Sequence, residues 1–284
     1  MKLYKDVVRV MVLSCCVMGA AGQQLVVTSA ADFGVGLPSG GSIASVFCAG
    51  LKGIDTIKLP PSGVVAPLEL AGVTVSINGR PAPLLSVAPV TGFYQINLQV
   101  PSGDSESSQS DVVVKLKQGE LELQATIPIR GTSPGEFFRS GGVDGIFQRI
   151  NVGYSLVTPQ SPARAGDTLV AYLTGLPTTR PAVLDGVVTP QQPLSIVPQY
   201  NETFGTEKFS VVIDGRPVDP LFVGLTPGMI GLYQVNFVMP TVATNAPQVV
   251  LLRESCGAIF GSCSNGGGLR TSRRSNAVVL YAGQ

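Results

Sequence analysis

Cysteine is the most reactive side chain in this sequence, and two cysteines lie close together near the C-terminal end. Cys256 and Cys263 bracket the residues Gly-Ala-Ile-Phe-Gly-Ser. In an oxidising compartment, cysteines at this spacing favour a disulfide across a small loop. Cys48 differs because it lies within an apolar strand pattern, where a free cysteine is typical of a small buried hydrophobe. The sequence therefore predicts a disulfide between Cys256 and Cys263 and an inert Cys48.

Arginines follow the second of these cysteines within one segment, residues 254–275. The segment contains a run of three glycines and then Arg270, Arg273 and Arg274. Guanidinium groups bind carboxylates, sulfates and phosphates through paired hydrogen bonds. We interpret the segment as a candidate binding loop that the disulfide holds at its base. The alternative is an insertion that a surface loop tolerates, with arginines that aid solubility.

Histidine is absent from the chain. Its absence excludes Ser-His-Asp and Cys-His catalysis and imidazole metal sites. Cys256 and Cys263 lack further thiolate or imidazole ligands, and no Asp-x-Asp-x-Asp-Gly series is present, so we expect no metal and no cofactor. No obvious catalytic pair stands out among the 18 acidic residues. We expect no enzymatic activity, although carboxylates from distant strands could still meet in a carbohydrate-active enzyme.

The charge of the chain is nearly balanced, with 19 basic and 18 acidic residues. A balance of this kind gives no long-range field that would gather nucleic acid. We therefore expect no nucleic-acid partner.

The N-terminal segment has the pattern of a secretory signal peptide. Lys2, Lys5 and Arg9 precede an apolar stretch, which small residues up to Ala21 follow. The apolar stretch is much shorter than the roughly 20 residues of a membrane span. We predict that residues 1–21 are removed, that the mature chain has no integral membrane span, and that the protein is secreted or held in the cell envelope. Lipidation at Cys15 or Cys16 is a weaker alternative.

An internal repeat organises the rest of the chain. Residues 41–51 match residues 166–176, and residues 75–101 match residues 211–240. Each copy contains Asn/Asp-Gly-Arg-Pro, then an apolar stretch, then Tyr-Gln-aliphatic-Asn. Such self-similarity predicts two related domains, which we place at residues 22–134 and 135–284.

The patterns within each repeat are those of β-strands. Tyr94, Ile96 and Leu98 alternate with Gln95 and Asn97, which predicts an apolar face and a wetter face. The second copy repeats the alternation from residue 233. The Asn-Gly and Asp-Gly pairs are typical of tight hairpins. The predicted fold class is all-β, with two tandem immunoglobulin-like β-sandwich domains.

The repeat motifs also resemble a known family. The motifs Val-Ser-Ile-Asn-Gly-Arg-Pro-Ala-Pro-Leu and Tyr-Gln-Ile-Asn-Leu-Gln-Val-Pro, with their second copies, are similar to the uncharacterised C-terminal domain family of Solibacter-type acidobacterial secreted proteins. The resemblance covers roughly residues 30–284 and implies tandem immunoglobulin-type domains in an exported bacterial protein. It supplies no catalytic residues.

Four repeated residues and one long interval have simple structural interpretations. Arg80 and Arg216 follow glycine in matched turns, where we expect them to continue a solvated turn; a paired anion site is the alternative. The rings of Tyr94 and Tyr233 are expected to pack, with each hydroxyl holding a neighbouring loop, and a stacking platform for sugars is the alternative. Residues 177–214 are rich in Pro, Thr and Gln, which is typical of a surface loop.

The function that these features favour is an exported, non-catalytic interaction or adhesion module. Its partner would be a protein or polysaccharide at the cell surface, bound through loops at the sandwich ends. One alternative is a structural spacer or assembly subunit of the cell envelope. The carbohydrate-active enzyme with a carboxylate pair is the other.

Overall fold

The computed structural model of the chain describes residues 25–61, 65–102, 111–130, 135–198, 207–257 and 269–283. The predicted signal peptide, residues 1–21, lies outside the described residues. The chain forms two compact units that do not follow the sequence order. Unit 1 comprises Met1–Thr132, Val183–Gln191 and Thr226–Leu232, and unit 2 comprises Ser133–Ala182, Gln192–Leu225 and Tyr233–Gln284.

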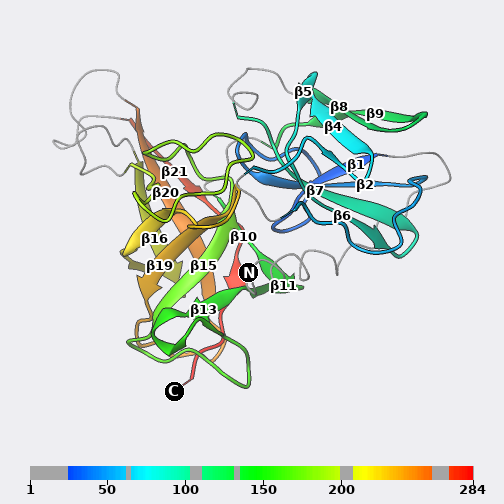
Figure 1. Ribbon diagram of the computed structural model, residues 1–284. Coiled ribbons are helices and arrows are strands. Elements are labelled where there is room, and N and C mark those ends of the chain that lie inside the picture. Colours follow the sequence, from blue (N-terminus) through cyan, green and yellow to red (C-terminus); the bar gives the residue numbers. More distant parts are fainter. Residues whose placement is uncertain are drawn as a thin grey trace. The chain divides into compact units, whose positions relative to one another are not determined.

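Unit 1 is a sandwich of two antiparallel sheets (Figure 1). One sheet has the strand order β1-β2-β7-β6, and the other has the order β3-β4-β8-β9 with β5 beside β4. If β1, β2, β4, β6, β7, β8 and β9 are lettered A to G, the sheets are A-B-E-D and C-F-G, which is the order of a constant-type immunoglobulin domain. The strands are β1 (Val26–Ser29), β2 (Ile43–Cys48), β3 (Glu69–Leu70), β4 (Val73–Ile77), β5 (Arg80–Pro81), β6 (Leu84–Val90), β7 (Phe93–Gln99), β8 (Asp111–Gln118) and β9 (Leu121–Pro128).

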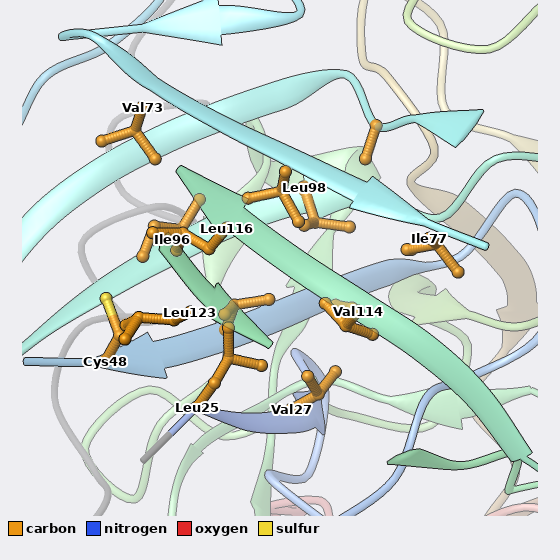
Figure 2. Close-up of a cluster of buried hydrophobic side chains, with 14 of the residues drawn as sticks. Leu25, Val27, Cys48, Val73, Ile77, Ile96, Leu98, Val114, Leu116 and Leu123 are labelled. Atoms are coloured by element: carbon orange, nitrogen blue, oxygen red, sulfur yellow. The ribbon is translucent and has the colours of Figure 1, made fainter. Parts of the chain in front are cut away.

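The core of unit 1 lies between these two sheets. Ile96 and Leu98 project from β7 toward Val114 and Leu116 of β8, as Figure 2 shows, and all four are fully buried. Cys48 belongs to the same core. The two-residue period of the strands therefore builds the predicted apolar face.

The prediction that the opposite face of β7 is the wetter one was wrong, because its polar side chains are buried. Gln95 is 2% exposed and Asn97 is 1% exposed. Asn97 accepts hydrogen bonds at Oδ1 from Ser45 Oγ at 2.7 Å and from Gln95 Nε2 at 2.9 Å, and its Nδ2 donates to Ser86 Oγ at 3.1 Å. Buried polar groups are stable when they are bonded in this way. Sequence alternation gives the side of the sheet on which a residue lies but not what covers that side.

Unit 2 repeats the plan of unit 1. One sheet has the order β14-β13-β15-β19-β18 with β10 beside β15, and the other has the order β11-β12-β22-β20-β16-β17 with β21 beside β20. Lettering β13, β15, β16, β18, β19, β20 and β21 as A to G again gives A-B-E-D and C-F-G. The all-β, two-sheet sandwich class predicted from the sequence is confirmed. The elements are β10 (Glu136–Phe137), β11 (Arg139–Gly141), β12 (Asp144–Gly145), β13 (Phe147–Arg149), the 3-10 turn η1 (Ile150–Val152), β14 (Ser155–Leu156), β15 (Thr168–Thr174), β16 (Glu207–Ile213), β17 (Arg216–Val218), β18 (Phe222–Leu225), β19 (Tyr233–Val238), β20 (Gln248–Gly257), β21 (Leu269–Arg274) and β22 (Val278–Val279).

The matched Gly-containing turns form tight hairpins in both units. Asn78 and Gly79 have φ angles of 48° and 81°, and Asp214 and Gly215 have 46° and 81°. Two successive positive φ angles define a type I′ turn, whose twist matches the flanking strands. Each turn also holds the next long strand, because Asn78 Oδ1 accepts from Val113 N and Asp214 Oδ1 accepts from Gln248 N.

The interval 177–214 is not simply the predicted surface loop. Residues 183–191 are part of unit 1, and Thr189 within them is 1% exposed. Ser102 donates two hydrogen bonds to the Asp185 carboxylate, one from its backbone amide at 2.7 Å and one from its hydroxyl at 2.6 Å. Val187 also forms a β-bridge with Val65. The polar composition of the interval therefore serves internal hydrogen bonds as well as solvent.

Helices contribute almost nothing to the described part of the chain. Within it, no helix is long and apolar enough to cross a membrane.

Candidate binding site

The predicted binding loop begins and ends in the strands of a β-hairpin. β20 pairs with β21 without interruption from Leu252, opposite Arg274, to Gly257, opposite Leu269. Residues 254–257 and 269–274, which the sequence indicated as parts of a loop, therefore belong to these strands. Residues 258–268 between the strands lie outside the described residues. Figure 1 shows β20 and β21 side by side, next to β16.

Strand alternation decides which side of the sheet each hairpin residue occupies. Phe209 of β16 is buried in the core of unit 2 and stands opposite Arg253 of β20. Arg253 in turn stands opposite Arg273 of β21. Residues that stand opposite each other in adjacent strands share a face. Phe209, Arg253 and Arg273 therefore lie in line across the three strands on the same face of the sheet, with Phe209 in the core.

The other face of the sheet carries Arg274 of β21 and Lys208 of the adjacent strand β16. Arg274 follows Arg273 directly, so it points to the opposite side of the sheet. It stands opposite Leu252, and Lys208 stands opposite Glu254. The predicted cluster of arginines is thus divided between two faces. Arg270 pairs with Cys256 by its backbone, and its side chain lies outside the described part.

We call Lys208, Arg253, Arg273 and Arg274 the cationic hairpin. Lys208, Arg273 and Arg274 are exposed, and Arg253 is half-buried. Glu254 is the acidic residue among them, so the described side chains of this region hold four positive charges and one negative charge. The sequence did not indicate Lys208 and Arg253 as part of the site, because both precede the predicted loop at residues 254–275. The strand register brings them into the same part of the sheet as Arg273 and Arg274.

The predicted disulfide falls at the edge of the described residues. Cys263 lies outside them, and Cys256 is described only by its backbone. The pairing of the two therefore remains a prediction. Cys48 is fully buried and free. Burial raises the pKa of its thiol to about 12, because the low-polarity core disfavours the thiolate.

Unit 2 also has a shallow hollow, which no pattern in the sequence indicated. Its volume is about 350 Å³, and one wall is Tyr281. The Tyr281 hydroxyl donates to Asp144 Oδ1 at 2.9 Å, and this hydrogen bond raises the pKa of Tyr281. The lining residues are Pro159, Pro162, Asn245, Tyr281, Ala282 and Gly283. The lining offers one aromatic ring and one amide, but no nucleophile or general base is placed for catalysis.

The repeated arginines and tyrosines occupy the turns and strand starts that the repeat predicted. Arg80 and Arg216 are exposed beside their turns. Tyr94 packs against the core of unit 1, and the Tyr233 hydroxyl donates to the carbonyl of Pro177 at 3.1 Å. Tyr233 therefore holds a neighbouring loop as expected. No group of three or more acidic or cysteine side chains suited to a metal ion occurs among the described residues.

Comparison with known proteins leaves the chain without an assigned family. No family model and no curated protein matches it. Among solved structures, it is similar to dimeric latent PorU from Porphyromonas gingivalis (10% identity, TM-score 0.28, 91% of this chain and 24% of that chain). Others are tandem Ig repeats of Dlar (13%, TM-score 0.18, 92% and 99%) and the endo-fucoidan hydrolase MfFcnA4 from glycoside hydrolase family 107 (12%, TM-score 0.15, 87% and 28%).

The chain spans about a quarter of the length of PorU and of the fucoidan hydrolase. TM-scores this low carry no argument about activity. The fold assignment rests on the strand order within each unit.

Proposed function

We propose that this protein is an exported, non-catalytic interaction module that binds an anionic component of the cell surface through the cationic hairpin. Two sandwich units of immunoglobulin topology support a binding or adhesive role, because such scaffolds carry their binding groups at strand ends and hairpins. The N-terminal signal pattern supports export. The absence of histidine from the sequence supports a role without catalysis, as does the lack of a catalytic arrangement among the described residues of the hairpin.

The observation that carries the proposal is the placement of Arg253 opposite Arg273 on one face of the sheet, with Arg274 and Lys208 on the other face. Like charges directly opposite in neighbouring strands destabilise a sheet. An anion that binds at this pair would interact with two guanidinium groups at once. The local excess is not a property of the whole chain, which has 19 basic and 18 acidic residues.

The corresponding hairpin of unit 1 shows the contrast. There Lys117 forms an ion pair with Glu122 across β8 and β9, at 2.9 Å between Nζ and Oε2. The described part of this hairpin therefore carries an ion pair in unit 1 and an excess of basic residues in unit 2. The difference favours unit 2 as the binding end.

The partner that fits is an extended polymer bearing sulfate, carboxylate or phosphate groups. Adjacent strands lie about 5 Å apart, so Arg253 and Arg273 can engage one anionic group or two neighbouring ones. Arg274 and Lys208 on the other face can contact the next part of an extended chain. An acidic surface polysaccharide presents this repeated charge, and an acidic protein segment presents it over a shorter length.

The test is an array of glycans and proteins probed with the mature chain. Arg273→Glu together with Arg274→Glu is expected to weaken binding at least tenfold, because both attractions become repulsions. Arg80→Glu together with Arg216→Glu is the matched control, since these exposed arginines lie on turns elsewhere. Binding should also fall steeply with salt.

Three other outcomes would each reject the proposal. Equal loss in both double variants would indicate nonspecific charge attraction. The absence of any ligand would favour a structural spacer. Aggregation of Arg273→Gln with Arg274→Gln, without a loss of binding, would show that the arginines only protect an edge strand.

A further inference from the structure

β9 is the last strand of its sheet, and its outer edge is open over most of its length. It pairs with β8 along all eight of its residues, Leu121 to Pro128. On the other edge, the described residues provide a single bridge, from Leu37 to Ile129. The backbone groups along the outer edge from Leu121 to Ile127 therefore have no strand partner within the described part of the chain.

Exposed sheet edges are templates for pairing with another chain, and folded proteins normally protect them. The sheet ends of unit 1 other than β9 show such protection. β1 has four residues, and β3 and β5 have two each, with Pro81 in β5. β6 has a register shift between Leu84 and Ser86, and Lys58 pairs with Val87 on it.

The sheet ends of unit 2 are protected by similar means. β14 has two residues, β11 has three, and β17 contains Pro217. Ile196 bridges to Gly224 on β18. β21 carries Arg273 and Arg274 along its length. Shortness, proline, a covering segment or positive charge thus occurs at each of these ends.

β9 has none of these protections before its final residue. Its register with β8 is regular, without a bulge. Its one charged side chain, Glu122, is in the ion pair with Lys117. Pro128 occupies the last position, next to the part that Leu37 already pairs. An eight-residue, regular edge with one neutralised charge favours pairing with another strand.

The side chains of β9 are also complementary to a second copy of the same strand. Leu121, Leu123, Ala125 and Ile127 face the core side, and Glu122, Gln124 and Thr126 are exposed. This alternation reads the same in both directions from Gln124. Two antiparallel copies related by a two-fold axis at Gln124 therefore place apolar residues beside apolar ones and polar residues beside polar ones.

We propose that β9 is a self-association surface, at which a second copy of this chain adds its own β9 antiparallel to form one continuous sheet. In this arrangement Gln124 faces Gln124 of the partner subunit, where two side-chain amides can bond to each other. Glu122 faces Thr126 of the partner subunit, so no like charges oppose each other. The interface is isologous and closes at two subunits.

Cross-linking at one position tests both the surface and the register. Gln124→Cys, made with Cys256 and Cys263 replaced by serine, should form a disulfide-linked dimer on mild oxidation. Directly opposite residues have Cβ atoms about 5 Å apart, which is close enough for a disulfide. Thr126→Cys is the matched control, because it is equally exposed but lies opposite Glu122 of the partner subunit. Equal cross-linking of both variants, or of neither, overturns the proposal.

Charge exchange tests the same contact without oxidation. By sedimentation equilibrium, Gln124→Lys and Gln124→Glu should each dimerise at least tenfold more weakly than the unaltered chain. An equimolar mixture should recover dimers, because lysine then faces glutamate. Circular dichroism would check that both variants fold. A chain that stays monomeric at several hundred micromolar, or variants that dimerise as before, would overturn the proposal.

Discussion

Gln99 of β7 accepts a hydrogen bond at its side-chain oxygen from the backbone amide of Gly186, at 2.6 Å. The two residues are 87 positions apart in the sequence and both belong to unit 1. The other end of the same amide donates to the carbonyl of Gly41 at 3.3 Å. One side chain of the first repeat thus holds a segment that the second repeat contributes.

Gln99→Val should destabilise the protein by about 1–3 kcal/mol, because the buried amide of Gly186 would lose its acceptor. Valine is the residue that the second repeat carries at the matching position, 238. Equilibrium urea unfolding measures the change. Val238→Gln is the reciprocal control and should stay within about 0.5 kcal/mol, because that side chain is 40% exposed.

Asn97→Ala should cost about 2–4 kcal/mol, since three buried partners would lose a hydrogen bond together. Asn236→Ala provides the matched comparison in unit 2. Asn236 is half-buried and accepts from Gln234 Nε2 at 3.2 Å, and it stands opposite Val170, whereas Asn97 stands opposite Ser45. We expect its loss to cost about 1 kcal/mol. Equal costs by thermal or urea unfolding would contradict the role given to the buried network.

Asp214 allows backbone and side-chain effects to be separated in one turn. Its φ angle is 46°, its Oδ2 accepts from Thr244 Oγ1 at 2.7 Å, and its Oδ1 accepts from Gln248 N at 2.9 Å. Asp214→Ala should cost about 2 kcal/mol through strain and lost hydrogen bonds. Asp214→Gly removes only the bonds and should cost about half as much. Asp214→Asn, the residue of the first repeat, should be nearly neutral; a large loss for it would rule out this account of the turn.

Because the Cys48 thiol is buried, we expect the protein to lose stability in alkaline solution. An unfolded thiol has a pKa near 8.5, whereas burial raises the pKa of Cys48 in the folded protein to about 12. Between these values the unfolded state releases a proton that the folded state keeps, so stability falls as pH rises, by up to about 1.4 kcal/mol per pH unit. Below the unfolded pKa this contribution is fully present.

Urea unfolding at pH 8, 9 and 10 would measure this slope as the difference between the unaltered chain and Cys48→Ala. The other cysteines, the lysines and the tyrosines are common to both proteins, so their titration cancels. Parallel slopes would contradict burial of the thiol. The folded protein should also leave Cys48 unreactive toward a thiol reagent at pH 8.

Local patterns predicted much of the architecture because they act over a few residues. Gly79 and Gly215 indicated hairpins, since tight turns need positive φ angles, and the alternation around Ile96 indicated a core face. The burial of Gln95 could not be predicted in this way, because the groups that bond it lie on other strands. Arg253 could not be assigned to the site for the same reason. Its position opposite Arg273 depends on the register of the β20–β21 hairpin, and the Gly- and Ser-rich residues between the two strands gave the segment the composition of a loop.

The division of the chain into units was also beyond local patterns. The matched ranges 41–51 and 75–101 lie closer together in the sequence than 166–176 and 211–240, but nothing in residues 183–191 indicates that Asp185 bonds to Ser102. Hydrogen bonds between positions 83 apart leave no local trace in composition. A second sequence from a related chain, with correlated changes at the two positions, could have revealed them.

Because unit 1 takes in residues 183–191 and 226–232, the chain passes between its two units five times. A gene cut between codons 134 and 135 would encode an N-terminal half without two of its own structural segments, and a C-terminal half with two segments left over. The two halves of the repeat therefore depend on each other, and neither can be deleted or moved as a separate segment without removing part of the other unit.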